Sequence, residues 1–269
     1  MRPAVRRALR SACALALVGG AIVACKGSQA NDAPWTLVWS DEFDETALDS
    51  TKWKVDTGNS FGTGQQDFDT AQNLSVSGGY LTITAKEESY MGSSYTSGRI
   101  ETSGLFSQTY GRFEARIKIP QGQGMWPAFW MLGSNYSTQG WPQCGEIDIM
   151  ENAGADPTTV FGSMHGPGGD NKTQGYQLPG TASFADDFHI FAVEWEPGEI
   201  RWYVDSTQYE TQDADLLPNS QQWVFDDPFF VILNLAVGGT YAGPTNSSVP
   251  FPQTMVVDYV HVYSRPEPS

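Results

Sequence analysis

The sequence predicts an all-β fold in which two sheets pack as a sandwich. Glycine (28) and proline (16) are plentiful, aromatic residues make up 13% and charged residues only 17%, as in chains of short strands joined by tight turns. Apolar runs of strand length recur, and no window carries a convincing amphipathic helical stripe with caps. Strands spaced this densely in one unbroken block favour a sandwich, whose curved sheet would offer a polymeric ligand a groove.

The clearest strand pattern lies at residues 112–119. Apolar Phe113, Ala115 and Ile117 alternate there with charged residues, which predicts a strand with one buried and one wet face. Residues 214–219 are expected to hold no more than a short helical turn. Four further apolar or aromatic runs are predicted to be buried or half-buried strands: residues 80–85, 188–195, 229–237 and 256–263.

The N-terminus has the layout of an export signal. Four arginines within the first ten residues precede a short, small and apolar segment at 11–24, which is too short for an ordinary transmembrane helix. The segment ends in Ile-Val-Ala-Cys and resembles the bacterial lipoprotein processing box, in which cleavage precedes a cysteine that then carries lipid. We therefore expect an exported protein whose only membrane attachment is a lipid on Cys25, at the cell surface or envelope. Ordinary cleavage after Ala30 or Ala33 would instead give a free extracellular protein.

The predicted organisation is a signal peptide at 1–24, a polar spacer at 25–34 and one domain at 35–269. Cys13 leaves with the signal and Cys25 takes the lipid, so no disulfide framework is available. Cys144 is expected to be a small buried thiol. A Cys25–Cys144 bridge would require that lipidation fails.

The charge balance is strongly acidic. The net charge is −16, and removal of residues 1–24 leaves 11 basic against 31 acidic residues, a net charge of −20. This argues against nucleic acid or an anionic membrane surface as the main partner, although solubility alone can explain the acidity. A neutral polymer remains compatible with it, and we expect a monomer.

The segment Glu-Ile-Asp-Ile-Met-Glu carries the predicted chemistry. In a regular strand, Glu146 and Asp148 share one face, whereas Glu151 would point into the core. An unpaired ionised carboxylate there would be very costly. Either the strand ends at Met150, or a bulge near Ile149 or Met150 returns Glu151 to the face of Glu146.

The bulge would place three carboxylates on one face and push their pKa values apart, so that one is ionised while another holds a proton. Glycoside hydrolysis needs that division. The six residues alone would equally suit an exposed amphipathic strand. Upstream, however, Trp126 and Trp130 share a strand face and Trp141 follows in the approach loop, and aromatic rings beside acids are typical of sugar sites.

At this point the chain resembles glycoside hydrolase family 16, in its bacterial endo-1,3-β-glucanase (laminarinase) branch. The resemblance runs from about Trp39 to Tyr263, essentially the whole predicted domain. The segments that carry it are Tyr-Gly-Arg-Phe-Glu-Ala-Arg (110–116), Trp-Pro-Ala-Phe-Trp-Met-Leu-Gly (126–133), Trp-Pro-Gln-Cys-Gly-Glu-Ile-Asp-Ile-Met-Glu (141–151), His-Gly-Pro-Gly (165–168), Leu-Asn-Leu-Ala-Val-Gly-Gly (233–239) and Val-Asp-Tyr-Val (257–260).

The resemblance implies a concanavalin-like jelly roll with a concave substrate cleft and retaining cleavage of internal β-1,3-glucosidic bonds in laminarin-type glucans. Glu146 would be the nucleophile, Glu151 the general acid and then base, and Asp148 an aid to proton placement. In a retaining site the two carboxyls lie about 5–5.5 Å apart.

The resemblance also implies supporting residues. Trp126, Trp130 and Trp141 would stack on sugars. Arg99 and Asn234 would bind hydroxyls, and His165 would lie beside the acid/base, although a structural role suits Asn234 and His165 nearly as well. No cofactor is expected for catalysis, but a structural Ca²⁺ on the convex side would be held by Glu42, Gly79 and Asp258.

Two departures and several alternatives remain. Tyr241 stands where relatives usually have Trp-Pro-Gly, and Gly169-Asp170 stand where an aromatic residue is often seen. Mixed-linkage glucan or agarose would be other substrates within the family, and the negative charge disfavours sulfated carrageenan. A lectin-like binding jelly roll would need no pair of glutamates. A metallohydrolase is disfavoured because His165, His189 and His261 lack paired ligand spacing.

Overall fold

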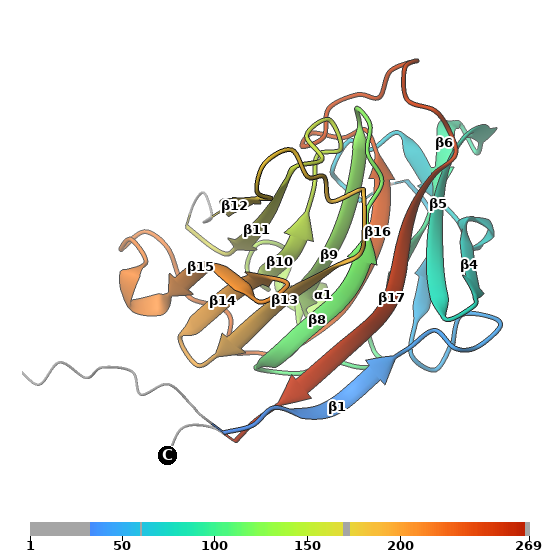
Figure 1. The fold of residues 1–269 in the computed structure, drawn as a ribbon. Helices are drawn as coiled ribbons and strands as arrows, with labels where there is room; N and C mark the ends of the chain where they lie inside the picture. Colours follow the sequence, from blue (N-terminus) through green and yellow to red (C-terminus); the bar gives the residue numbers. More distant parts are fainter. Residues whose placement is uncertain (1–32, 60, 169–172, 267–269) are drawn as a thin grey trace, which may run out of the picture. The chain divides into compact units, whose positions relative to one another are not determined.

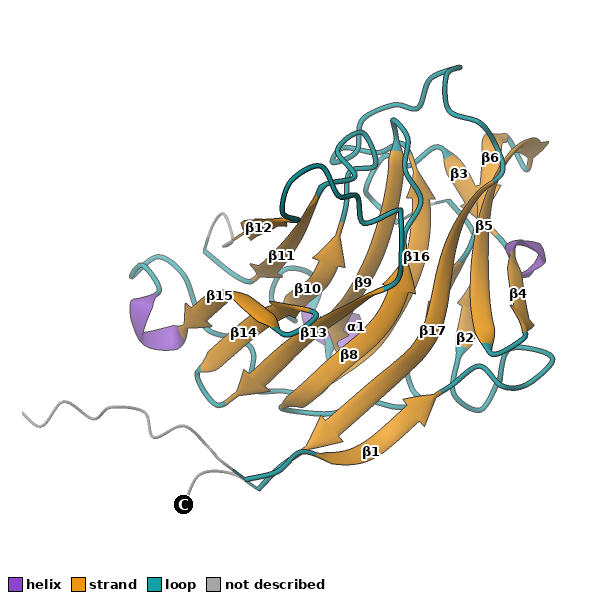
Figure 2. Ribbon diagram, in the orientation of Figure 1, coloured by secondary structure: helices purple, strands orange, loops and turns teal. Residues whose placement is uncertain are grey.

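The protein folds into two largely antiparallel sheets (Figure 1). The structure is a computed structural model, and it describes residues 33–59, 61–168 and 173–266. Within these ranges one sheet has ten strands and the other seven, and helix is confined to three short turns (Figure 2). The predicted all-β, two-sheet class is therefore confirmed. Residues Ala33–Pro266 form a compact unit. The predicted signal peptide, most of the spacer and Cys25 lie outside the described residues.

The ten-stranded sheet has the order β15-β14-β13-β8-β17-β5-β6-β3, with β1 on β17 and β4 on β5. All four further runs predicted to be strands are confirmed: three lie in this sheet, at β5, β13 and β17, and the fourth is β16 of the other sheet. The strands of this sheet are β1 (Thr36–Asp41), β3 (Asp67–Asp69), β4 (Leu74–Ser77), β5 (Tyr80–Tyr90), β6 (Ser93–Ser97), β8 (Gly111–Lys118), β13 (His189–Glu196), β14 (Glu199–Val204), β15 (Thr207–Asp213) and β17 (Gln253–Ser264).

The seven-stranded sheet has the order β12-β11-β10-β9-β16-β7-β2. The short helical turns are α1 (Tyr136–Gln139), η1 (Ala71–Asn73) and η2 (Ala214–Leu216), the last within the segment predicted to hold one. The strands of this sheet are β2 (Lys54–Asp56), β7 (Arg99–Glu101), β9 (Met125–Gly133), β10 (Glu146–Glu151), β11 (Thr159–His165), β12 (Thr173–Gln177) and β16 (Phe229–Val237).

The core lies between the two sheets and is rich in aromatic side chains. Phe113, Ala115 and Ile117 of β8 are fully buried in it, as their alternation predicts. The buried indole of Trp202 in β14 donates a hydrogen bond of 2.8 Å to the backbone carbonyl of Asp148 in β10. Since a buried N–H without a partner is costly, this bond fixes one sheet against β10 of the other.

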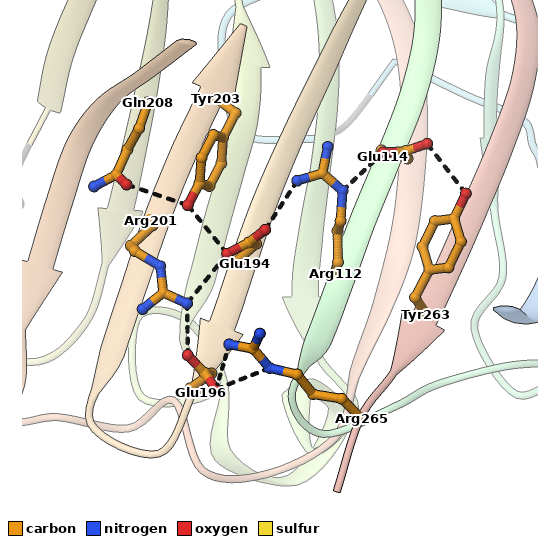
Figure 3. A network of polar contacts seen from close by, with 9 residues as sticks. All are labelled: Arg112, Glu114, Glu194, Glu196, Arg201, Tyr203, Gln208, Tyr263 and Arg265. Atoms are coloured by element: carbon orange, nitrogen blue, oxygen red, sulfur yellow. Dashed lines mark hydrogen bonds and ion pairs between the residues drawn. The ribbon is translucent and has the colours of Figure 1, made fainter. Parts of the chain in front are cut away.

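The outer face of the ten-stranded sheet carries a network of ion pairs and hydrogen bonds across β8, β13, β14 and β17 (Figure 3). Arg201 contacts Glu194, Glu196 and Glu199, and Arg112 joins Glu114 to Glu194. Several charges share partners, so the network cross-links neighbouring strands in a way that an isolated surface pair would not. The network explains why charged residues alternate with apolar ones at 112–119, since Arg112 and Glu114 belong to it.

Cys144 is a free cysteine and only 1% exposed, which confirms the expected small buried thiol. Burial raises the pKa of the Cys144 thiol to about 11, so it stays protonated at neutral pH. Within the ranges described above, no helix combines the length and hydropathy needed to cross a lipid bilayer.

Candidate active site

The bulge predicted near Ile149 or Met150 is present in β10. Against β9, Asp148 pairs with Trp130 and Met150 with Phe129, so Ile149 has no partner residue in the register. The extra residue shifts the alternation by one position. Ile147, Ile149 and Met150 are buried in the core, whereas Glu146, Asp148 and Glu151 all line one cleft.

This cleft has a volume of about 750 Å³ and runs along the outer face of the seven-stranded sheet. Alternate residues of β9 and β16 contribute side chains to it, as the period of two requires. The structure brings together in it all nine residues predicted to act in catalysis or sugar binding: Arg99, Trp126, Trp130, Trp141, Glu146, Asp148, Glu151, His165 and Asn234.

The three acids have different neighbours. The Nε2 atom of His165 lies 3.0 Å from Oδ2 of Asp148 and 3.8 Å from Oε1 of Glu146. Glu151 instead accepts a hydrogen bond of 2.7 Å from the indole N–H of Trp126. The histidine therefore lies between Glu146 and Asp148, and Trp126 orients Glu151.

Burial is the main cause that raises the pKa of all three carboxyls. The charge of Asp148 raises the pKa of Glu146 further, and the charge of Glu151 does so for Asp148. Two contacts oppose burial at Glu151, namely the Trp126 hydrogen bond and the charge of His165. Negative charge on one carboxyl raises the pKa of another, so the ionisations of the three acids are coupled.

Trp130, Asn234 and Arg99 form a connected group across β9, β16 and β7. The indole N–H of Trp130 donates a hydrogen bond of 2.8 Å to Oδ1 of Asn234. The Arg99 guanidinium lies 4.9 Å from the Trp130 ring centroid and 4.5 Å from that of Phe61, and its Nε donates to Asp56 at 2.8 Å. Asn234 therefore has the partner that a half-buried amide needs, while it still faces the cleft.

The rim of the cleft is aromatic. Trp141 is 53% exposed, and its ring centroid lies 6.3 Å from that of His165. Tyr241, the departure noted in the sequence, packs against Trp126 with ring centroids 5.2 Å apart. Burial first and the charge of Glu151 second raise the pKa of Tyr241. The tyrosine is therefore a neutral ring close to Glu151.

Several cleft residues were not predicted from the sequence. Among them, Asp56, Phe61 and Tyr136 line the cleft, and the first two contact Arg99. Asp56 is brought to Arg99 by the pairing of β2 with β7, in which these two residues are partners 43 positions apart. No local pattern in the sequence marks such a pair.

The residues expected to hold Ca²⁺ lie outside the cleft. Glu42 follows β1, and its carboxylate is 2.7 Å from Nε2 of His261. Asp258 in β17 pairs with Arg116 at 2.5 Å, and Gly79 lies in the turn between β4 and β5 with φ +81°. Both acidic candidates thus have a nitrogen partner in the structure. The calcium site stays a prediction.

Comparisons with known proteins agree with this geometry. Residues 61–260 match the family described as Glycosyl hydrolases family 16. A beta-glucanase of Rhodothermus marinus is 44% identical over 255 residues, which cover 88% of each chain.

Two solved structures are similar over most of the domain. The endo-beta-1,3-glucanase from Pyrococcus furiosus has a TM-score of 0.84 and 42% identity, covering 86% of this chain and 95% of the other. The laminarinase catalytic domain from Thermotoga maritima has a TM-score of 0.83 and 43% identity, covering 87% and 99%. These matches confirm the predicted family and the glycoside hydrolase class. The chain belongs to family 16 of the glycosyl hydrolases.

Proposed function

We propose that this protein is an endo-β-1,3-glucanase that hydrolyses internal bonds of laminarin-type glucans. The observation that carries the proposal is the bulge in β10, which presents Glu146, Asp148 and Glu151 together to a cleft lined by tryptophans. The similar proteins named above support the substrate, because their names describe beta-glucanases, endo-beta-1,3-glucanases and laminarinases.

The proposed chemistry is a double displacement with retention. Glu146 attacks the anomeric carbon and forms a glycosyl ester, while Glu151 gives its proton to the departing glycosidic oxygen. Glu151, now ionised, takes a proton from water, and the hydroxide oxygen attacks the anomeric carbon. This step breaks the ester, returns Glu146 to its carboxylate form and leaves Glu151 protonated again.

The neighbours of the two glutamates fit these roles. The N–H of Trp126 fixes one oxygen of Glu151, so the other oxygen can face the glycosidic bond. The buried carboxyl of Asp148 lies between the glutamates in the strand, and burial and the charge of Glu151 hold its pKa well above its usual range. A protonated Asp148 lacks the negative charge that otherwise raises the pKa of Glu146, so it favours the ionised form of the nucleophile.

We propose that the cleft binds sugar through tryptophan rings and polar side chains. Trp126 and Trp141 offer rings for stacking against the C–H faces of glucose units. Arg99 and Asn234, which contact Trp130, offer polar groups to sugar hydroxyls. The cleft crosses several strands, so it suits binding within a polymer chain.

The test measures release of reducing ends from laminarin, curdlan, lichenan, agarose and xyloglucan. We expect laminarin to be cut, and Glu146→Gln to lose about four to six orders of magnitude in kcat, as other enzymes do without their nucleophile. Glu45→Gln, at an exposed acid outside the cleft, is the matched control and should retain activity. Cleavage of another polymer with laminarin untouched would contradict the substrate, and activity that survives in Glu146→Gln would contradict the mechanism.

We also propose that the protein is exported and acts as a monomer anchored by lipid at Cys25. The N-terminal pattern supports export, and the processing box supports the anchor. Metabolic labelling with radioactive palmitate tests the anchor. Label should enter the wild type and be absent from Cys25→Ser, whereas release of an unlabelled wild-type protein into the medium would contradict it.

A further inference from the structure

A histidine and two carboxylates in the cleft are arranged like a metal-ligand set. Glu146, Asp148 and His165 each offer one donor atom, and these three atoms lie within 4.8 Å of one another. The side chains come from neighbouring strands, since Glu146 in β10 is the direct partner of His165 in β11. Strand pairing therefore holds the three donors, whether or not an ion is present.

The spacing of the donors suits zinc. Zinc binds histidine nitrogen at about 2.0–2.1 Å and carboxylate oxygen at about 2.0–2.2 Å, so two donors of a tetrahedral site are about 3.4 Å apart. His165 Nε2 lies 3.0 Å from Asp148 Oδ2 and 3.8 Å from Glu146 Oε1. These two distances lie on either side of the tetrahedral value, and the third pair of donors, on Glu146 and Asp148, lies within 4.8 Å.

One donor oxygen is buried without a hydrogen bond. Asp148 is 4% exposed, and its Oδ2 makes no hydrogen bond, although the Nε2 atom of His165 lies 3.0 Å away. A buried carboxylate oxygen without a partner is costly. A cation between Asp148 and His165 would satisfy the oxygen and the imidazole lone pair together.

The site is also open to an ion from solvent. Glu146 and His165 keep 19% and 25% of their side-chain surface exposed and line the open cleft. Glu151 adds a further carboxylate to the cleft. Three protein ligands with access to water leave a fourth position for a water molecule, as in zinc sites with three protein ligands.

We propose that Glu146, Asp148 and His165 bind a divalent transition-metal ion of the zinc class, and that the bound ion blocks hydrolysis. Imidazole with carboxylate oxygens favours zinc over the hard cations calcium and magnesium, which prefer oxygen alone. Binding follows from the geometry of the three donors. Inhibition rests in addition on the proposed function, because the ion would occupy the oxygen of Glu146 that attacks the sugar.

The experiment is a calorimetric titration of the metal-free full chain with zinc chloride, with magnesium chloride as the comparison ion. We expect one zinc ion per cleft, no comparable magnesium heat, and at least tenfold weaker zinc binding in His165→Ala and in Asp148→Asn. Removing a group that only hydrogen-bonds to a metal ligand already weakens metal affinity by about 10- to 100-fold, so tenfold is the least we expect when a ligand itself is removed. His189→Ala is the matched control, because His189 lies 3.0 Å from one carboxylate, that of Asp205, outside the cleft. Circular dichroism verifies that each variant is folded.

Zinc binding that is absent, that persists unchanged in both cleft variants, or that weakens equally in His189→Ala would overturn the site. In a laminarin assay we expect zinc to inhibit competitively and chelation to restore activity. Binding without inhibition would overturn the inhibitory half of the proposal. A protein that binds zinc at this site but cleaves no laminarin would leave the site standing and contradict the proposed function instead.

Discussion

The indole N–H of Trp126 donates a hydrogen bond of 2.7 Å to Oε1 of Glu151. Trp126 lies on β9 and Glu151 at the end of β10, beyond the bulge, so the bond exists only because the bulge turns Glu151 to the cleft face. A donor to a carboxylate favours its ionised form and therefore lowers the pKa of Glu151 against the effect of burial.

Trp126→Phe keeps an aromatic ring and removes the donor. The pKa of Glu151 should rise, and because a general acid must be protonated, the alkaline limb of the kcat/KM profile should move to higher pH. We expect kcat on laminarin to fall by about tenfold, since the hydrogen bond that orients Glu151 is lost. Trp130→Phe, whose indole donates to Asn234, is the control and should leave that limb in place. A limb that stays or moves to lower pH in Trp126→Phe would exclude this role.

Tyr241 supports Trp126 from the rim of the cleft. Tyr241→Ala removes the ring that packs 5.2 Å from Trp126, so kcat/KM on laminarin should fall by about 5- to 10-fold, the value of one aromatic contact. Tyr241→Phe keeps the ring and should retain most of the activity. Steady-state kinetics on laminarin decide the matter, and equal losses in both variants would mean that the hydroxyl acts instead of the ring.

Asp67 and Asp69 form a buried acid pair beside the cleft, which the sequence did not indicate. The Nε2 of Gln65 donates to both, and Asp67 also accepts from the backbone N–H of Val237. Burial is the first cause that raises the pKa of Asp67 to about 6 and of Asp69 to about 8, and repulsion by Asp67 is the second cause at Asp69. The pair therefore retains a proton at neutral pH.

The folded-state pKa values of this pair lie above the ordinary value of 3.8, so its contribution to stability is complete below about pH 4 and is lost as the pH rises through about 6 and about 8.

The variant Asp69→Asn imitates the neutral acid. It should melt several degrees above the wild type at pH 9, with a smaller difference at pH 5, because ~1 kcal/mol corresponds to ~2–4 °C in a chain of this size. Calorimetry of both proteins and of Glu45→Gln checks this; a Tm difference independent of pH would contradict it.

The calcium prediction is tested by thermal unfolding in calcium and in EGTA. The resemblance predicts that calcium raises Tm and that Glu42→Gln and Asp258→Asn abolish the calcium-dependent part. Only the calcium-dependent change in Tm is compared, because each variant also loses a contact. Glu42→Gln loses the contact to His261, and Asp258→Asn loses the contact to Arg116. Glu45→Gln should respond like the wild type. A wild type that does not respond would assign both carboxylates to their contacts alone.

Local sequence patterns were sufficient to predict many of the strands and the strand that carries the three acids. Alternation at 112–119 gives the buried face of β8, and the apolar run at 229–237 coincides with β16. The cost of a charge in the core left two conformations open, a strand that ends at Met150 or a bulge, and the pairing with β9 shows the bulge. The tryptophans that share the cleft face with the acids follow from the same period of two.

The sequence by itself therefore determined the sheet class, the strand that carries Glu146, Asp148 and Glu151, and the family to which the chain belongs. Only the tertiary structure decided which neighbours the acids and Arg99 have: His165 beside Asp148, Trp126 on Glu151, and Asp56 on Arg99. Alternation depends on residues two apart, which the sequence displays directly. Contacts between strands depend on register and sheet order, and these are set by the packing of the whole core.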